Sequence, residues 1–208
     1  MKEKLIQRYS AAERINHWIV AGCFVLLAIS GLAFFYPAFF WLTGVFGTPQ
    51  LARLLHPFIG VVMFLAFARQ FFRYWHHNFI DKEDVKWMKA VGEVMKGNEV
   101  GDIGRYNGGQ KGMFWLMCAC MATLLVTGLV IWRQYFAIYF PIPVIRIALL
   151  LHAASAIALI AGIIVHVYAA LWVKGTIRAM VEGVVTHGWA KKHHPRWYRE
   201  MTGKNSGE

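Results

Sequence analysis

The sequence has few charged residues for its length. Asp, Glu, Lys and Arg make up 16% of the 208 residues, whereas 58% are hydrophobic and the mean hydropathy is +0.43. Soluble globular domains carry about 25% charged residues. Acidic residues are the scarcest, 11 against 22 basic ones, which gives a formal net charge of +11. The composition therefore predicts a membrane protein, with too few polar residues for a second globular domain.

The basic residues flank the hydrophobic runs, which favours a role at the membrane surface over nucleic-acid binding, so no nucleic-acid partner is expected. If the N-terminal segment, the polar loop 76–111 and the C-terminal tail lie on one side, then these segments and the span ends next to them, including Arg69 and Arg73, hold 19 of the 22 Lys and Arg. Arg53, Arg133 and Arg146 lie opposite. The positive-inside rule then predicts a multi-pass membrane protein with both termini cytoplasmic. The polar N-terminus does not resemble a cleaved signal peptide, and none is expected.

Cysteine is also scarce. Cys23, Cys118 and Cys120 all lie within apolar runs. Neither a disulfide framework nor an iron–sulfur ligand set is therefore expected.

Four apolar runs are long enough for a helix to cross a bilayer core of about 30 Å. They cover about residues 14–36, 51–75, 112–133 and 143–173. The expected fold is all-α, a four-transmembrane-helix bundle over residues 1–175, followed by a basic cytoplasmic tail at 176–208. In the cytoplasmic loop 76–111, helical spacing of apolar residues predicts a surface helix within 83–97, and the glycine-rich stretch after it is expected to be a loop.

Four histidines interrupt these runs at two depths. His152 and His166 are 14 residues apart, which is about 21 Å along a helix and about 40° short of four turns, so they share a face. With both termini on one side, His56 has the depth of His152, and His17 that of His166. Ionisable residues inside a span are costly and usually functional. Because imidazole ligates haem iron and a low-spin haem needs two axial ligands, the pattern predicts two haems.

The absence of a C-x-x-C-H motif makes these haems non-covalent, of b type. In the alternative reading, each histidine is neutral and hydrogen-bonded to a carbonyl or hydroxyl of a neighbouring helix. Arg53 and Arg146 are candidates for binding haem propionates or for anchoring the helices at the interface. The other histidines are expected to be solvated residues beside the membrane: His76, His77, His187, His193 and His194.

Seven segments together resemble the cytochrome b (gamma) subunits of respiratory, membrane-bound formate dehydrogenases. They span nearly the whole chain: ERINHW at 13–18, GTPQLARLLHPFIG at 47–60, RYWHHN at 73–78, GRYNGGQK at 104–111, LLHAASA at 150–156, VHVYAALWVKGTI at 165–177 and WAKKHHPRWYRE at 189–200.

The resemblance implies a four-helix membrane anchor with two b haems, the periplasmic-side haem on His56 and His152 and the cytoplasmic-side haem on His17 and His166. It also implies a menaquinone site beside the second haem, at Asn107 and Gly109, to which we add Gln110. The implied partners are an iron–sulfur beta subunit and a periplasmic catalytic alpha subunit, together with membrane lipids, in a higher oligomer of the heterotrimer. The chain itself would not oxidise formate. It would carry electrons to menaquinone in anaerobic respiration.

Three alternatives remain at this stage. The chain could be the cytochrome b subunit of another periplasmic oxidoreductase, such as a hydrogenase or thiosulfate reductase. It could be a transporter or proton conductor that uses intramembrane histidines without haem, or a purely structural anchor. For the GRYNGGQK segment, an ordinary turn before the third span is the alternative to a quinone pocket.

Overall fold

A computed structural model describes residues 4–98 and 100–203. The chain divides into two compact units. The helical unit comprises residues 15–72 and 116–165, and the terminal unit comprises residues 1–14, 73–115 and 166–208. Each unit is described by itself below.

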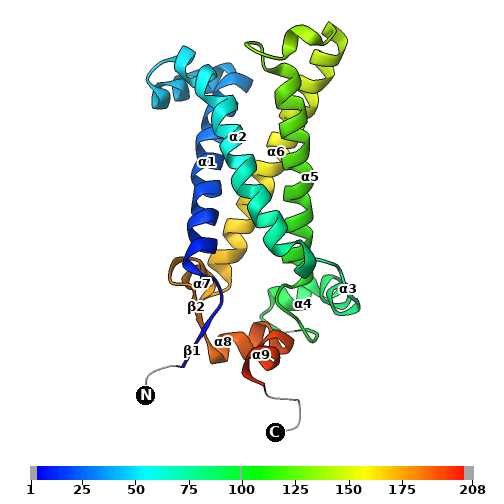
Figure 1. The fold of residues 1–208 in the computed structure, drawn as a ribbon. Helices are drawn as coiled ribbons and strands as arrows, with labels where there is room; N and C mark the ends of the chain where they lie inside the picture. Colours follow the sequence, from blue (N-terminus) through cyan, green and yellow to red (C-terminus); the bar gives the residue numbers. More distant parts are fainter. Residues whose placement is uncertain (1–3, 99, 204–208) are drawn as a thin grey trace. The chain divides into compact units, whose positions relative to one another are not determined.

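Four long helices dominate the fold: α1 (Ala11–Phe35), α2 (Pro49–Tyr74), α5 (Gly108–Ile131) and α6 (Ile142–Trp172), which can be followed in Figure 1. All four are long and apolar enough to cross a membrane. Only 11–17% of the residues in their most apolar windows are buried within the protein. Since few of these apolar residues are buried, the surface suits lipid rather than water. The predicted all-α fold with four transmembrane helices is confirmed.

Side chains from all four helices form the core of the helical unit. Its buried members come from α2, α5 and α6, and partly buried residues of α1 pack against them: Met63, Phe67, Cys120, Met121 and Leu159, with Val20, Cys23, Phe24 and Leu27. Buried Asn16 connects α1 to α2, because its side-chain amide donates to the Ala66 carbonyl at 2.9 Å. All three cysteines are free thiols in the structure.

The connections at the far ends of these helices are short and aromatic. A 3₁₀ helix, η1 (Pro37–Phe46), joins α1 to α2, and η3 (Ala137–Tyr139) lies between α5 and α6. Thr48 caps α2, since its hydroxyl accepts from the Leu51 amide at 3.1 Å, and Pro49 is the first helical residue. Threonine followed by proline is a common helix start, because the proline lacks only a hydrogen bond that the first turn does not make.

The terminal unit brings the start and the end of the chain together. Strand β1 (Leu5–Gln7) pairs antiparallel with β2 (Val184–Thr186), with Ile6 opposite Val185. Around this ribbon lie α7 (Thr176–Val181), α8 (His187–His193) and α9 (Pro195–Thr202). Their core comprises Ile6, Ala179, Val185, Ala190 and Trp197. The residues expected to form a tail are thus held by a β-ribbon and a small core of their own.

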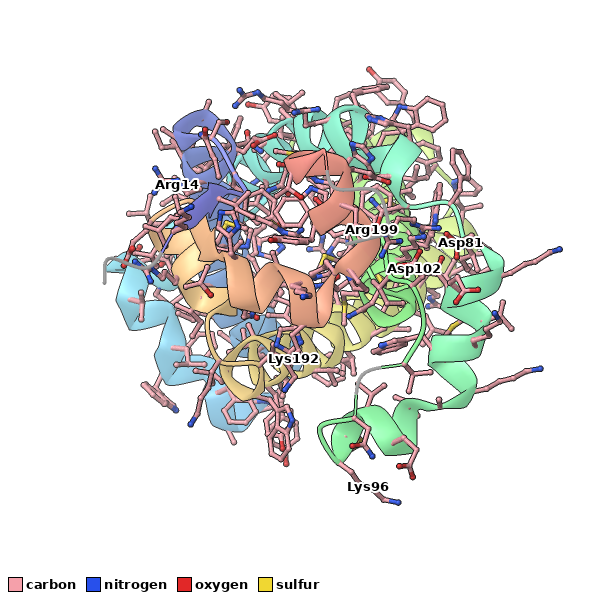
Figure 2. All side chains as sticks on the ribbon, turned by 90° about the horizontal axis from the view of Figure 1, so that it is seen from below. Arg14, Asp81, Lys96, Asp102, Lys192 and Arg199 are labelled. Carbon is pink, nitrogen blue, oxygen red and sulfur yellow. The ribbon has the colours of Figure 1, made fainter. Side chains whose placement is uncertain are left out.

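The loop between α2 and α5 begins with η2 (Trp75–His77) and contains α3 (Lys82–Lys89) and α4 (Val91–Met95), where a surface helix was predicted. Asp81 caps α3 through hydrogen bonds from the amides of Glu83 and Asp84, and its carboxylate also binds Arg196 of α9 at 2.7 Å. Burial raises the pKa of Asp81. The hydrogen bonds from Arg196 and from the Asp84 amide, together with the charge of Lys111, outweigh burial and lower this pKa to about 2. A second link of this kind joins Asp102 to Arg199 at 2.6 Å, and both residues are labelled in Figure 2.

His194 is buried, contrary to the expectation that it is solvated. Only 2% of it is exposed, and its Nδ1 lies 2.8 Å from the Gly104 carbonyl. Its Nε2 lies 3.4 Å from the guanidinium of Arg8, which stacks over Trp197 at 4.3 Å. Because Nδ1–H donates to the carbonyl and Nε2 faces a cation, the ring is held neutral. Burial, followed by the charge of Arg8, moves the pKa of His194 well below its usual value.

We expect acid to destabilise the terminal unit through His194. Since its pKa is lowered by folding, its contribution is complete above the unfolded pKa of about 6.5 and is lost below it, at up to about 1.4 kcal/mol per pH unit. Melting curves of the detergent-solubilised protein between pH 7.5 and 5.5 should therefore show a falling melting temperature, less steeply in His194→Gln. The control is His193→Gln, at the more exposed neighbouring position. An unchanged slope in His194→Gln would contradict the assignment.

Candidate functional site

A cavity of about 870 Å³ lies within the helical unit, lined by all four long helices. Cofactor and ligand sites usually have about 300–1,000 Å³ and mostly apolar walls. Leu, Ile, Val, Phe, Ala and Gly form most of this wall, and the polar side chains on it are few: Arg53, His56, Arg133, Gln134 and His152. The cavity therefore has the size and polarity of a site for a large, mainly apolar group.

His56 of α2 and His152 of α6 face each other in this cavity. Their ring centres are 6.4 Å apart and the ring planes are inclined by 56°. Two imidazoles on opposite sides of one metal ion, with metal–nitrogen bonds of about 2.0–2.1 Å and ring centres about 1.1 Å further out, have centres about 6.2–6.4 Å apart. The predicted pair is thus brought together at the spacing that a shared metal requires.

Each of these imidazoles is held by a hydroxyl group of the preceding helix. Ser30 Oγ of α1 lies 2.7 Å from His56 Nδ1, and Thr127 Oγ1 of α5 lies 2.9 Å from His152 Nδ1. The sequence reasoning did not single out either hydroxyl residue. Each is followed by a glycine and stands 26 or 25 residues before its histidine. This repeated spacing of Ser-Gly or Thr-Gly to histidine is the signal that could have revealed them.

The cations at the cavity differ from those expected. Arg53 lines it, as proposed, but the second lining arginine is Arg133 rather than Arg146. Arg133 follows the end of α5, whereas Arg146 lies in the first turns of α6. Because residues near the end of α5 line the cavity, Arg133 reaches the site although its position in the sequence suggested only a helix boundary.

The second predicted pair consists of residues in different units. His17 of α1 lies in the helical unit, where its ring makes an edge-on contact with Trp18, with centres 5.3 Å apart. His166 of α6 lies in the terminal unit and has an exposed side chain. The pairing of these two histidines stays a prediction from their depths in the sequence.

The residues predicted to bind quinone begin helix α5 rather than form a loop. Asn107 Oδ1 accepts from the Gln110 amide at 2.9 Å, and Gln110 Oε1 accepts from the Asn107 amide at 3.0 Å. This reciprocal pair is a capping box, which satisfies amides that the first helical turn leaves unpaired. A Cβ at Gly109 would lie 2.9 Å from Trp87 of α3, so this glycine allows α3 and α5 to pack closely. All three residues therefore have structural roles.

A second cavity, of about 480 Å³, lies within the terminal unit. Its wall includes His76, His77, Arg105 and Arg196, whereas Asn107, Gly109 and Gln110 are not part of it. Over residues 4–98 and 100–203, no three His, Cys, Asp or Glu side chains are grouped as ligands of a bare metal ion. Two imidazoles alone suit a metal that brings its other ligands with it, as haem iron does.

Comparisons with known proteins identify the family of the chain. Residues 8–183 match the family described as prokaryotic cytochrome b561. The chain is 62% identical to the cytochrome b556(fdo) subunit of formate dehydrogenase from Escherichia coli K12, over 94% of this chain and 93% of that protein. It is 57% identical to the cytochrome b556 subunit of formate dehydrogenase from Haemophilus influenzae, over 94% and 83%. Identity to the nitrate-inducible cytochrome b556(Fdn) subunit of Escherichia coli K12 is 54%, over 96% and 93%. The chain therefore belongs to the prokaryotic cytochrome b561 family and is a multi-pass membrane protein of a haem b family.

Proposed function

We propose that this protein is the dihaem cytochrome b subunit of a formate dehydrogenase. In this proposal it anchors the complex in the inner membrane and carries electrons from the iron–sulfur subunit to menaquinone near the cytoplasmic side. Its relatives are named as cytochrome b556 subunits of formate dehydrogenases and align with almost the entire chain. Formate oxidation itself belongs to a partner subunit.

The observation that carries the proposal is the facing of His56 and His152 across an apolar cavity, with ring centres 6.4 Å apart. Haem b held between them supplies reversible one-electron transfer at a depth that water does not reach. The protein residues supply axial nitrogens, an apolar wall that excludes water, and cations. Arg53 and Arg133 at the cavity suit the negative charges of haem propionates.

The proposal places a second haem between His17 and His166. It rests on the depths of these histidines in α1 and α6 and on the shared face of His152 and His166 along α6. Two haems at different depths would carry electrons across more of the membrane than a single haem could. Membership of a cytochrome family argues against a haem-free transporter. A purely structural anchor would not need the imidazoles of His56 and His152 at the spacing of two ligands of one metal.

The proposed orientation puts the terminal unit in the cytoplasm. This unit contains both chain ends and every Lys and Arg except Arg53, Arg69, Arg133 and Arg146. Positive charge beside transmembrane helices stays on the cytoplasmic side. Reduction of menaquinone takes two electrons and two protons, so a quinone site on this side would draw its protons from the cytoplasm. The catalytic alpha subunit and the electron source then lie on the periplasmic side.

The test of the proposed function is a haem count on the purified protein. We expect a b-type absorption spectrum and two haems per chain, with one haem lost in His17→Ala. Co-purification with an iron–sulfur subunit and a formate-oxidising subunit is expected. A folded, colourless protein would refute haem binding altogether. One haem per chain would refute the second site, and co-purification with a hydrogenase or thiosulfate reductase would favour that alternative.

Asn107 allows quinone binding to be separated from helix capping. Asn107→Asp keeps an oxygen that caps α5 but removes the amide donor, whereas Asn107→Ala removes both and costs about 0.5–2 kcal/mol of stability. If the amide binds menaquinone, Asn107→Asp should retain the wild-type melting temperature and both haems but lose most quinone reduction, measured with reduced haem and a menaquinone analogue. Normal quinone reduction by Asn107→Asp would limit this residue to capping.

A further inference from the structure

We propose that Ser30 and Thr127 are positioning residues that hold the imidazoles of His56 and His152 in the Nδ1-protonated form and thereby lower the reduction potential of the haem between them. The inference rests on the proposed binding of haem by these two histidines. Neither hydroxyl would touch the haem iron, and each would act only through its histidine.

The Ser30 hydroxyl has three possible hydrogen-bond partners but only one hydrogen to donate. It is fully buried, and its Oγ lies 2.9 Å from the Leu26 carbonyl, 3.2 Å from the Leu27 carbonyl and 2.7 Å from His56 Nδ1. A carbonyl oxygen can only accept, so the hydroxyl hydrogen is donated along α1. Its oxygen is then the acceptor for the ring, and His56 Nδ1 carries the proton.

Thr127 repeats this arrangement on α5. It is 5% exposed, and its Oγ1 donates to the Thr123 carbonyl at 2.6 Å. The same oxygen lies 2.9 Å from His152 Nδ1 and accepts the ring proton there.

The opposite tautomer would place the proton on Nε2. In the described residues the hydrogen bonds of both rings are made at Nδ1, and the cavity wall has two arginines and one glutamine but no carboxylate. A proton on Nε2 would therefore be an unpaired N–H in an apolar cavity, which is unfavourable. With the proton on Nδ1, the Nε2 lone pair is available to a metal, and metal-ligating histidines usually donate their other N–H in this way.

A glycine follows each hydroxyl residue on the part of the helix against which the ring packs. A methyl group added at Gly31 would lie 3.8 Å from His56 Cε1, and one added at Gly128 would lie 3.4 Å from His152 Cε1. Both rings thus lie against the backbone of the helix that supplies the hydroxyl. The same hydroxyl–glycine pair serves a histidine twice, from α1 to α2 and from α5 to α6, which favours a specific role over chance.

The effect on potential follows from the hydrogen bond. A ring that donates from Nδ1 is a stronger electron donor at Nε2, and this favours ferric over ferrous iron. Loss of the acceptor removes that preference and raises the potential. A tenfold smaller preference for the ferric state corresponds to a rise of about 59 mV. Because hydroxyl groups are neutral acceptors, the ring keeps its proton and the charge of the site does not change.

The test is a potentiometric titration of both haems in the intact complex. In Ser30→Ala we expect the reduction potential of one haem to rise by up to about 59 mV, which is the value for a tenfold change. The potential of the other haem should not change. Thr127→Val should raise the potential of the same haem, because His152 Nδ1 loses the hydroxyl that accepts its proton. Ser30→Thr and Thr127→Ser should restore the wild-type value. Thr123→Val is the matched control, since Thr123 Oγ1 on the same helix donates to the Ala119 carbonyl.

Four outcomes decide the inference. A shift confined to one haem, and absent in Thr123→Val, supports it. Loss of that haem from Ser30→Ala, restored in Ser30→Thr, also supports it. Wild-type potentials in Ser30→Ala and Thr127→Val with both haems bound would overturn the positioning role but leave the proposed function intact. A wild-type protein without haem would instead overturn the proposed function.

Discussion

Replacing His56 by alanine is expected to remove one haem from each chain and to lower electron transfer from formate to menaquinone by at least about a hundredfold. Loss of residues that only support a metal ligand already costs about 10–100-fold, and His56 provides one of two axial nitrogens. The measurements are the haem content per chain, the b-type difference spectrum and the rate of quinone reduction. The same result is expected for His152→Ala, because both rings would ligate one iron.

Two variants separate haem loss from a failure to fold. His56→Met keeps an axial ligand that occurs in cytochromes with higher potentials, so it should retain both haems with one potential raised. His76→Ala is the control for a histidine that does not line the cavity between His56 and His152. Its side chain is exposed. Full haem content and activity in both His56→Ala and His152→Ala would show that neither ring is a ligand.

Replacing Asp84 by asparagine is expected to destabilise the terminal unit by about 3 kcal/mol. Asp84 and Lys111 are 1% and 4% exposed, and Lys111 Nζ lies 2.5 Å from the Asp84 carboxylate. Removal of one member of a buried ion pair leaves the other charge without compensation, which costs about 3–5 kcal/mol. The lower end applies, because Lys111 retains Asp81 at 3.7 Å and the Phe79 carbonyl at 2.9 Å.

Thermal unfolding in detergent, followed by tryptophan fluorescence, measures this loss. The paired replacement Asp84→Leu with Lys111→Met should recover most of the stability, since apolar residues of similar volume often replace a buried ion pair without cost. Glu93→Gln is the control, because the Lys96–Glu93 pair is exposed and its loss should leave the melting temperature unchanged. Equal effects of Asp84→Asn and Glu93→Gln would show that burial does not determine the strength of the Asp84 pair.

Several features could be predicted from local sequence signals. Long apolar runs produced helices because a backbone in lipid must satisfy its own hydrogen bonds. Thr48-Pro49 begins α2, and threonine followed by proline favours such a start. The start of α5 was also encoded locally, since Asn107 and Gln110 have the spacing of a capping box. The adjacent glycines suggested a loop, but in the structure they allow α5 to pack against α3.

Other features depend on contacts between distant segments. His194 adjoins a lysine-rich stretch and was expected at the surface, yet Arg8 and Gly104, far away in sequence, enclose it. Arg133 rather than Arg146 lines the cavity because the ends of α5 and α6 contribute different faces to it. No local pattern distinguishes these arginines, since both lie near the end of an apolar run.

The sequence by itself determined the four apolar helices and the depths of their histidines, because length, hydropathy and a period of 3.6 residues are properties of each segment alone. Only the tertiary structure decided which hydroxyl holds which imidazole and which arginines reach the cavity. It also decided that the C-terminal residues pair with an N-terminal strand. The physical reason is that a hydrogen bond of 2.7 Å, such as that between Ser30 and His56, depends on how two helices pack, and this is fixed by side chains from all four of them.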